Sequence, residues 1–298
     1  MINFISVILP TYNPNLDRLN LTIKHLEQQT LAIDLWELII IDNNSNQRVT
    51  PILSKDINSK IIFVEKQGLT HARLAGFKVA KGELIVMVDD DNLLDRDYLK
   101  NALTVFDKKK DLGAAGGKVI PLFDTSPETW LKNFYSSLAI RDLGNEELIA
   151  TWENKYPDAS PIGAGMVIRK EALQSYINKA HVILDRTGSF LSSGGDNDIV
   201  LEILKSGWKV GYFPKLTLQH IIPKSRMAFK YICKLINHSN KSWVILLESH
   251  QINPWKKISS RTLKLRKIKA WFSNKAWMNK TNYIKWRAAC GLFDGLAE

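Results

Sequence analysis

The 298-residue sequence contains little cysteine and no long apolar run. Its two cysteines, Cys233 and Cys290, lie far apart and outside any metal-ligand spacing, which argues against a disulfide framework and against a zinc site. No segment offers the roughly 20 consecutive apolar residues that a bilayer-spanning helix needs. Internal repeats and low-complexity segments are also absent. The composition indicates a globular chain in a reducing, cytoplasmic setting, and its 45% hydrophobic content allows one large α/β domain with an appendage.

Acidic residues are scarce in the last quarter of the sequence. Residues 224–298 hold 16 Lys and Arg against three acids, whereas the preceding residues hold 25 against 27. The formal net charge of +11 therefore comes entirely from this last segment. The segment also contains five of the nine tryptophans, namely Trp243, Trp255, Trp271, Trp277 and Trp286.

Basic residues interleaved with tryptophan suit an anionic membrane surface. A solvated helical tail that packs on the rest of the chain through its tryptophans explains the same pattern. No recognisable nucleic-acid-binding module accompanies the charge, so we expect no nucleic-acid partner. The sequence thus predicts a domain over residues 1–223 and a basic, Trp-rich helical extension over residues 224–298. The extension either contacts the inner face of the membrane or only packs on the domain.

Short apolar runs alternate with amphipathic stretches of helix length through the first half of the sequence. This alternation is typical of a mostly parallel α/β sheet covered by helices on both faces. The predicted strands are Ile5–Leu9, Trp36–Ile41, Lys60–Val64 and Leu84–Val88. The predicted helices are Leu16–Gln29, Leu69–Ala80 and Arg96–Phe106. Because ligands bind at the carboxyl ends of the strands in such sheets, the polar residues that follow these strands are candidate site residues.

The second half of the sequence is less regular. We predict further strands over residues 116–119, 163–169, 207–213 and 216–219. Residues 192–198 are expected to open a helix that runs to about Ser206, and a helix or lid containing Trp130 is expected over residues 127–140.

Three carboxylates, Asp89, Asp90 and Asp91, stand side by side where a predicted apolar strand ends. Their mutual repulsion needs compensation, and a divalent cation held also by a diphosphate would supply it. Such a metal would neutralise the charge that builds up on a diphosphate leaving group. An Asp-rich segment of this kind also occurs as a solvated turn or a helix N-cap, so both interpretations stand at this point.

Three other residues near strand ends or helix starts suit a nucleotide. Asp42 can accept hydrogen bonds from a base edge or a ribose hydroxyl, or it can form an Asx-turn that reverses the chain. Tyr12 can stack under a base, with Pro10 shaping the turn, or it can be a buried tyrosine. Arg73 follows Gly68 near a helix start and can approach phosphates, although surface arginines are common on helices.

Asp196 and Asp198 lie beside a glycine pair at the start of a predicted helix. An ionised carboxylate at the mouth of a site can act as general base for a hydroxyl, and a helix N-terminus keeps Asp ionised. Asp is also a preferred N-cap residue, and the spacing alone favours the cap. His220, which follows a predicted strand, can be a metal ligand or a core histidine, and the core role is the more common one.

Taken together, these motifs resemble family 2 glycosyltransferases with the GT-A fold. The resemblance covers about the first 225 residues, and the ordered set of motifs is far more specific than any one of them. It is carried by Ser6-Val-Ile-Leu-Pro-Thr-Tyr-Asn13, by residues 36–45, 68–76, 82–92 and 163–169, and by Gly194–Pro223. The motifs Asp-Asp-Asp-Asn, Gly-Ala-Gly-Met-Val-Ile-Arg and His-Ile-Ile-Pro look most like the branch of hormogonium-polysaccharide glycosyltransferases.

The resemblance implies a role for most of the candidate residues. Asp196 matches the aspartate that deprotonates the acceptor hydroxyl while the diphosphate departs from the opposite face, which inverts the anomeric carbon. Asp91 would hold Mg²⁺ or Mn²⁺, with His220 as a second contact. The residues that would bind the nucleotide sugar are Pro10, Thr11, Tyr12, Asn13, Asp42, Arg73, Asp89 and Asp90.

Two positions depart from the family pattern. The glutamate that usually precedes the catalytic aspartate is Gly195 here, which bears on how the base is oriented and how the acceptor is placed. The frequent Ala-Arg-Asn of the family is Ala72-Arg73-Leu74 here, which removes one polar contact near the donor.

The resulting hypothesis is an inverting, metal-dependent transferase in polysaccharide or cell-surface glycan biosynthesis. It would move a sugar from a nucleoside diphosphate to a saccharide or lipid-linked saccharide, with the basic extension docked on the inner membrane face. A sugar nucleotidyltransferase is one alternative, but Pro10-Thr-Tyr-Asn-Pro14 is not the glycine-rich basic loop that such an enzyme would carry. A catalytically silent relative that binds saccharide or scaffolds an assembly is the other, and Gly195 encourages it.

Overall fold

The computed structural model describes residues 2–181, 185, 191 and 193–298. The chain forms two compact units. The first comprises Met1–Leu122, Ala139–Ala180 and Asp196–Ile221, and the second comprises Phe123–Leu138, His181–Gly195 and Ile222–Glu298. The predicted extension over residues 224–298 thus lies wholly in the second unit, together with two segments that precede it in the sequence.

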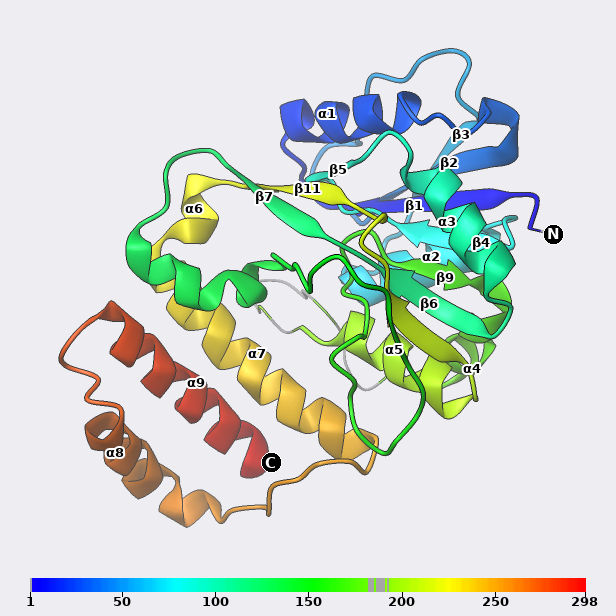
Figure 1. Ribbon diagram of the computed structural model, residues 1–298. Helices are drawn as coiled ribbons and strands as arrows, with labels where there is room; N and C mark the ends of the chain where they lie inside the picture. Colours follow the sequence, from blue (N-terminus) through cyan, green and yellow to red (C-terminus); the bar gives the residue numbers. More distant parts are fainter. Residues whose placement is uncertain (1, 182–184, 186–190, 192) are drawn as a thin grey trace. The chain divides into compact units, whose positions relative to one another are not determined.

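An eight-stranded sheet forms the centre of the first unit (Figure 1). Its strands, in spatial order, are β3 (Ser59–Phe63), β2 (Trp36–Asp42), β1 (Ile5–Thr11), β4 (Leu84–Met87), β9 (Val167–Arg169), β6 (Leu112–Gly116), β10 (Lys209–Tyr212) and β8 (Leu148–Ala150). β1 is parallel to β2 and to β4, β2 is parallel to β3, and β10 is parallel to β6. β9 and β8 run antiparallel to their neighbours. The sheet is therefore mostly parallel.

Helices pack on both faces of this sheet. They are α1 (Leu16–Glu27), α2 (Leu69–Val79), α3 (Tyr98–Lys108), α4 (Gln174–Asn178) and α5 (Gly195–Lys205), with 3₁₀ turns at Ile33–Leu35 and Lys170–Leu173. Successive side chains of a strand point to opposite faces, so Val7 and Leu9 of β1 join the core under α1 and α3, and Ile8 joins the core under α2 and α5. Each fully buried side chain of this size contributes about 1.5–3 kcal/mol. The predicted fold class is confirmed.

A buried carboxylate, Glu37, ties the amino ends of the strands together. It accepts hydrogen bonds from the Ser6 hydroxyl at 2.7 Å and the Lys81 N–H at 2.9 Å, and Lys60 Nζ lies 3.1 Å from its other oxygen. Burial alone raises the pKa of Glu37, but the hydrogen bonds from Ser6, Lys81 and Lys60 more than offset this and hold the pKa below its ordinary value. Glu37 therefore stays ionised inside the fold.

A smaller sheet joins segments that are far apart in the sequence. Its strands, in order, are β5 (Asn92–Leu94), β11 (Leu218–Ile222) and β7 (Val119–Phe123). β11 runs antiparallel to β5, with His220 opposite Asn92. This register brings the late histidine of the sequence beside the acidic turn that follows β4.

The predicted strand over residues 116–119 is wrong, because β6 ends at Gly116 and β7 begins at Val119. Gly117 between them passes very close to another backbone segment. A Cβ on Gly117 would stand 2.3 Å from the carbonyl oxygen of Phe213 and 2.1 Å from that of Leu216. Two strands and a tight glycine crossing therefore replace the single predicted strand.

Two other predicted elements are shorter or different. The strand expected over residues 163–169 extends only over β9, because Gly165 has φ +73° and turns the chain there. The Tyr98 hydroxyl donates to the Gly165 carbonyl and holds this turn. The expected helix or lid over residues 127–140 is a 3₁₀ helix, Thr129–Leu138, with a kink at Phe134.

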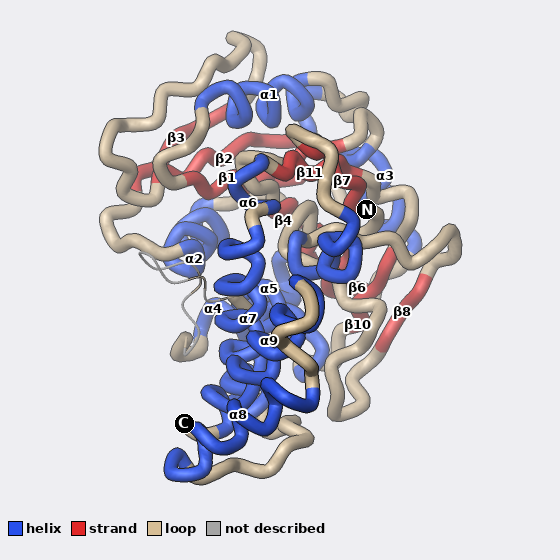
Figure 2. The backbone as a smooth tube through the Cα atoms, turned by 90° about the vertical axis from the view of Figure 1, so that its left-hand side faces the viewer, coloured by secondary structure: helices blue, strands red, loops and turns tan. Residues whose placement is uncertain are grey.

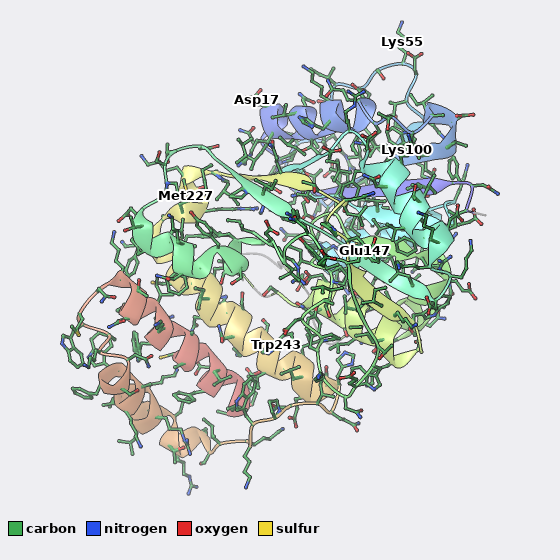
Figure 3. The ribbon with its side chains drawn as sticks, viewed as in Figure 1. Asp17, Lys55, Lys100, Glu147, Met227 and Trp243 are labelled. Atoms are coloured by element: carbon green, nitrogen blue, oxygen red, sulfur yellow. The ribbon has the colours of Figure 1, made fainter. Side chains whose placement is uncertain are left out.

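Helices dominate the second unit and confirm the predicted helical tail. They are α6 (Lys224–Met227), α7 (Phe229–Ser249), α8 (Leu263–Ser273) and α9 (Lys280–Leu296), with a 3₁₀ turn at Ser260–Thr262. α7, α8 and α9 lie side by side in Figures 1 and 2, and Figure 3 marks Trp243 on α7. Among the described residues, no helix combines the length and apolar composition that crossing a membrane requires.

Glycines allow α7 and α9 to pack closely. A Cβ on Gly291 would stand 2.0 Å from the carbonyl oxygen of Asn237, and a Cβ on Gly295 would stand 2.8 Å from Val244 Cβ. Asn237 also donates from Nδ2 to the Arg287 carbonyl at 2.9 Å. The two helices therefore meet backbone to backbone, at a distance that a larger residue would not permit.

Candidate active site

Three loops at the carboxyl ends of β1, β2 and β4 are joined by hydrogen bonds. Thr11 donates from Oγ1 to Asp90 Oδ2, which links the loop after β1 to the loop after β4. Asn13 donates its N–H to Ser45 Oγ at 2.9 Å, and its Oδ1 accepts from the Asn46 N–H at 2.8 Å, which links the loops after β1 and β2. Because the three strands are parallel neighbours, their loops form one connected cluster at one edge of the sheet.

Asp42 and Tyr12 differ in how exposed their side chains are to a ligand. The buried Asp42 carboxylate accepts from the Ser45 N–H at 2.9 Å and the Val49 N–H at 3.2 Å, so it organises its own loop as the turn interpretation required. Its contact with a nucleotide stays a prediction. Tyr12 is 46% exposed, so the alternative of a buried tyrosine is wrong and the ring is accessible for stacking.

Asn43, which the sequence analysis did not single out, positions the start of α2. Its Nδ2 donates to the carbonyls of Val64 and Lys66, and its Oδ1 accepts from the Gly68 N–H at 2.7 Å. Gly68 immediately precedes α2, which carries Arg73. The sequence signal for Asn43 was only its place in the polar run after β2.

The turn after β4 is organised by Asn92, a second residue that the sequence analysis left without a role. The fully buried Asn92 accepts at Oδ1 from the Asp89 N–H at 3.2 Å and donates from Nδ2 to Asp91 Oδ1 at 3.0 Å. Its own N–H donates to the Asp89 carbonyl at 3.0 Å. This one amide side chain therefore holds the backbone at Asp89 and the carboxylate of Asp91.

Asp91 and His220, predicted as metal contacts, lie together. His220 Nε2 is 3.4 Å from Asp91 Oδ1, and both residues are buried. The Ile221 N–H donates to the Asp91 carbonyl at 2.9 Å and fixes the strand beside the turn. Two ligand atoms at right angles, each about 2.1 Å from one ion, are about 3.0 Å apart. The pair therefore fits a shared divalent cation with little adjustment, in a carboxylate and imidazole donor set.

Arg73 and Asp196 lie beside Gly163, and Asp89 lies near Arg73. Arg73 is buried, and its Nη2 lies 3.8 Å from Asp89 Oδ1. Asp196, in the first turn of α5, accepts at Oδ2 from the Gly163 N–H at 2.8 Å. A Cβ on Gly163 would stand 3.0 Å from Arg73 Nη2 and 3.1 Å from Asp196 Oδ2. A guanidinium and a carboxylate thus lie beside a position where only glycine fits without displacement.

Asp198, the other carboxylate considered as a base, has a structural role. It is buried, and its Oδ1 lies 2.6 Å from Lys179 Nζ, which also lies 2.8 Å from Glu202 Oε1. Of the two aspartates at the start of α5, Asp196 is therefore the one that faces the cluster around Gly163.

A partly buried phenol, that of Tyr156, contacts the start of α5. Asn197 donates from Nδ2 to the Tyr156 hydroxyl at 2.7 Å. Burial raises the pKa of Tyr156, and the nearby negative charge of Asp196 raises it further. Tyr156 therefore stays neutral and remains a hydrogen-bond partner for the residue that follows Asp196.

The structure explains why residue 195 is glycine. The buried Asp185 accepts at Oδ2 from the Gly195 N–H at 2.9 Å. A Cβ on Gly195 would stand 2.5 Å from that same oxygen. A carboxylate from another part of the sequence therefore occupies the space that a side chain at position 195 would need. The sequence offered no signal for Asp185, because nothing in the sequence relates its position to that of Gly195.

The chain is similar in sequence to known glycosyltransferases. A sequence profile described as Glycosyl transferase family 2 matches residues 6–177. A stretch of 153 residues is 32% identical to the minor teichoic acid biosynthesis protein GgaB of Bacillus subtilis (strain 168), and it covers 47% of this chain. The same stretch spans only 16% of the length of GgaB.

Two solved structures have the same fold. S. aureus TarS 1-349 in complex with UDP superimposes with a TM-score of 0.55 at 15% identity, over 97% of this chain and 89% of that one. The mannosyltransferase PcManGT from Pyrobaculum calidifontis, in complex with GDP-Man and Mn²⁺, superimposes with a TM-score of 0.55 at 17% identity, over 96% and 73%. These likenesses confirm the predicted GT-A fold.

Proposed function

Because the chain belongs to glycosyltransferase family 2, we propose that it transfers a sugar from a nucleoside diphosphate to a saccharide or lipid-linked saccharide, with inversion at the anomeric carbon. The observation that carries this proposal is the arrangement after β4 and at the start of α5. One acidic turn presents Asp91 to His220 and Asp89 to Arg73, and Asp196 shares Gly163 with Arg73. Such a transfer requires a pair of ligands for a metal ion, a cationic side chain that binds phosphate, and a carboxylate base.

The departing diphosphate needs groups that stabilise its negative charge. Mg²⁺ or Mn²⁺, held by Asp91 and His220, would neutralise charge on the departing diphosphate. Arg73 is buried, so its guanidinium has a fixed position from which to donate hydrogen bonds to phosphate oxygens. The Mn²⁺ bound by the mannosyltransferase of the same fold supports this assignment.

Asp196 is the proposed general base. It takes the proton of the acceptor hydroxyl while the hydroxyl oxygen forms a bond to the anomeric carbon. The bond from that carbon to the diphosphate breaks on the opposite face, which inverts the configuration. The hydrogen bond from the Gly163 N–H stabilises the ionised carboxylate and orients it.

The donor pocket of this proposal is the loop cluster after β1 and β2. Pro10 and Tyr12 would contact the base, with the exposed Tyr12 ring stacked on it. Thr11, Asn13, Asp42 and Asp90 would contact the ribose or the diphosphate. The UDP and GDP-Man bound by the two solved structures of this fold support a nucleoside diphosphate ligand.

The acceptor is proposed to be a growing cell-surface glycan, presented at the cytoplasmic face of the membrane. The name of GgaB as a teichoic acid biosynthesis protein supports this, and so does the basic, Trp-rich composition of residues 224–298. Membership of the hormogonium-polysaccharide branch stays a prediction from the motifs.

The test is a screen of nucleotide sugars for hydrolysis and transfer, with and without Mn²⁺. Wild type, Asp91→Ala and Asp196→Asn are compared with Asp17→Asn, which removes an exposed carboxylate on α1 (Figure 3). Turnover that needs the metal, Asp91 and Asp196, and that survives Asp17→Asn, supports the proposal. Full activity of Asp196→Asn refutes the base assignment.

The two alternatives give different results in the same screen. A silent relative would bind a nucleotide sugar and never turn it over with any acceptor. A nucleotidyltransferase would release pyrophosphate from a nucleoside triphosphate and a sugar phosphate.

A further inference from the structure

Exposed apolar side chains are concentrated on one short segment of the second unit. Among the described residues, six large hydrophobic side chains are more than half exposed, and five of them lie within 14 consecutive residues. These five are Leu265 (70%), Ile268 (54%), Phe272 (62%), Trp277 (57%) and Met278 (61%). We call them the apolar ridge. The sixth, Ile52, lies in the first unit.

The first three residues of the ridge lie on one face of α8. At about 100° per residue, Leu265, Ile268 and Phe272 fall within about 60° of the helix surface. The opposite side of α8 is already packed, because Ala270 is buried and the Trp271 ring lies 4.8 Å from that of Trp286 on α9. The ridge is therefore a second apolar face, distinct from the one that packs against α9. The two helices lie side by side in Figures 1 and 2.

Trp277 and Met278 extend this face beyond the end of α8. The Trp277 ring lies 5.8 Å from the Phe272 ring in an edge-on contact. The two exposed aromatic side chains therefore belong to one surface.

The charged residues of the sequence that carries the ridge are all basic. The sequence from Ser249 to Phe293 contains 11 Lys and Arg and no Asp or Glu. On the helical projection, the exposed Lys264 lies on one side of the ridge and the exposed Lys269 on the other, and Lys275 is exposed in the turn that leads to Trp277. Other lysines of the unit have acidic neighbours, as Lys267 has Asp294 at 2.6 Å.

We propose that the apolar ridge inserts into the headgroup region of an anionic lipid bilayer, with Lys264, Lys269 and Lys275 contacting lipid phosphates. An apolar face with tryptophan at its edge and lysines on both sides matches the polarity gradient of a bilayer surface. A nucleic acid would take up the lysines but would leave Leu265, Ile268 and Met278 in water. This inference deepens the membrane contact of the proposed function, and it does not depend on sugar transfer.

The helix lies in the plane of the surface in this arrangement. Because α8 has 11 residues and its opposite side packs on α9, only one side of it can enter the lipid. Neighbouring lysines at the level of the headgroups add attraction that salt weakens.

The experiment measures binding of the full chain to vesicles. Phosphatidylcholine vesicles with and without phosphatidylglycerol are used, and bound protein is separated by flotation. Replacing Leu265, Ile268 and Phe272 together with Ser should reduce binding to the anionic vesicles by at least about a hundredfold. Replacing Lys264, Lys269 and Lys275 together with Gln should reduce it by about a hundredfold at low salt, at roughly 1 kcal/mol per lysine.

The matched control is Ile52→Ser, which removes the most exposed large hydrophobic side chain of the first unit. It should leave vesicle binding unchanged. Circular dichroism and thermal unfolding of each variant show whether the fold is kept. Quenching by lipids brominated near the headgroup should fall when Trp277 is replaced with Leu.

Three results would overturn the inference. The first is that the Ser variant and wild type bind anionic vesicles equally. The second is that wild type binds neutral and anionic vesicles equally. The third is that sedimentation without vesicles shows two copies of the chain associating through the ridge. Hydrolysis of a soluble donor by the Ser variant, compared with wild type, reports on the transferase proposal separately. Loss of vesicle binding with donor turnover intact supports the ridge, and failure of all donors leaves the vesicle result unaffected.

Discussion

Adding a side chain at position 195 should destabilise this protein, because Asp185 already occupies the space beside Gly195. In Gly195→Ala the new Cβ would stand 2.5 Å from Asp185 Oδ2, so one of the two must move by about 0.5–0.9 Å to reach an ordinary contact. Asp185 is buried, and its movement weakens the 2.9 Å hydrogen bond from the Gly195 N–H. Overpacking of this kind costs about 1–3 kcal/mol, and a hydrogen bond to a charged group contributes about 1.5–3 kcal/mol.

Gly195→Ala should lower the free energy of unfolding by about 2–4 kcal/mol in total. This total includes the gain of about 0.5–1 kcal/mol that alanine gives over glycine in a helix. Gly195→Glu should cost more, since a second carboxylate would then stand beside Asp185. The matched test introduces Gly195→Ala into two variants of Asp185. In Asp185→Ala the collision is gone, so Gly195→Ala should become neutral or stabilise by about 0.5–1 kcal/mol. In Asp185→Asn, which keeps the size of the side chain, Gly195→Ala should remain destabilising.

Urea unfolding followed by tryptophan fluorescence measures these differences. A change of sign between the Asp185→Ala and Asp185→Asn backgrounds establishes that Asp185 is the reason for glycine at this position. If Gly195→Ala has the same effect on the free energy of unfolding in both backgrounds, the steric explanation is refuted.

Three further predictions follow from the same structure. Replacing His220 with Gln should weaken Mn²⁺ binding about 10–100-fold by calorimetry, and Asp91→Ala should weaken it more; equal affinities for wild type and both variants would exclude the metal pair. Gly291→Ala should destabilise by about 1–3 kcal/mol and exceed Gly295→Ala, because the first Cβ meets backbone at 2.0 Å and the second meets Val244 at 2.8 Å; the reverse order in urea unfolding would contradict this packing. The pKa of Glu37 is held below its ordinary value in the folded chain. The ionised Glu37 therefore stabilises the fold at pH values above its pKa in the unfolded chain, and this stabilisation is lost as pH falls through its pKa in the folded chain. Glu37→Gln should therefore lower stability near neutral pH and flatten its decline in acid, and an unchanged pH profile would show that Glu37 is not the group responsible.

The local elements of the first half of the chain were predictable because they depend on side-chain periodicity. β1, β2 and β4 are buried along their whole length, so each reads as an unbroken apolar run. The predicted helix at Arg96 begins at Tyr98 instead, because the Asp97 N–H bonds to Asp95 Oδ1 and forms a turn before α3. Boundaries of this kind depend on single hydrogen bonds, which periodicity does not reveal.

The glycine-rich second half was less predictable. Gly117 and Gly165 are both determined by what approaches them from elsewhere, a carbonyl in one case and the Tyr98 hydroxyl in the other. A sequence shows that a glycine is present, but it does not show which segment comes close to it. The strands predicted through these glycines were for that reason too long or misplaced.

The sequence alone shows which residue types stand at the carboxyl ends of the strands, because hydrophobic runs locate those ends. It therefore named Asp91 and His220 as candidates, whereas the role of Asp196 as a base came only from the resemblance to family 2 glycosyltransferases. The three-dimensional fold brings His220 to Asp91, because the register of β11 on β5 places them together. It alone decided that Asp198 pairs with Lys179 and that Asp185 takes the space beside Gly195. Such pairings join residues far apart in the chain, and the packing of the whole fold, rather than any local pattern, brings them into contact.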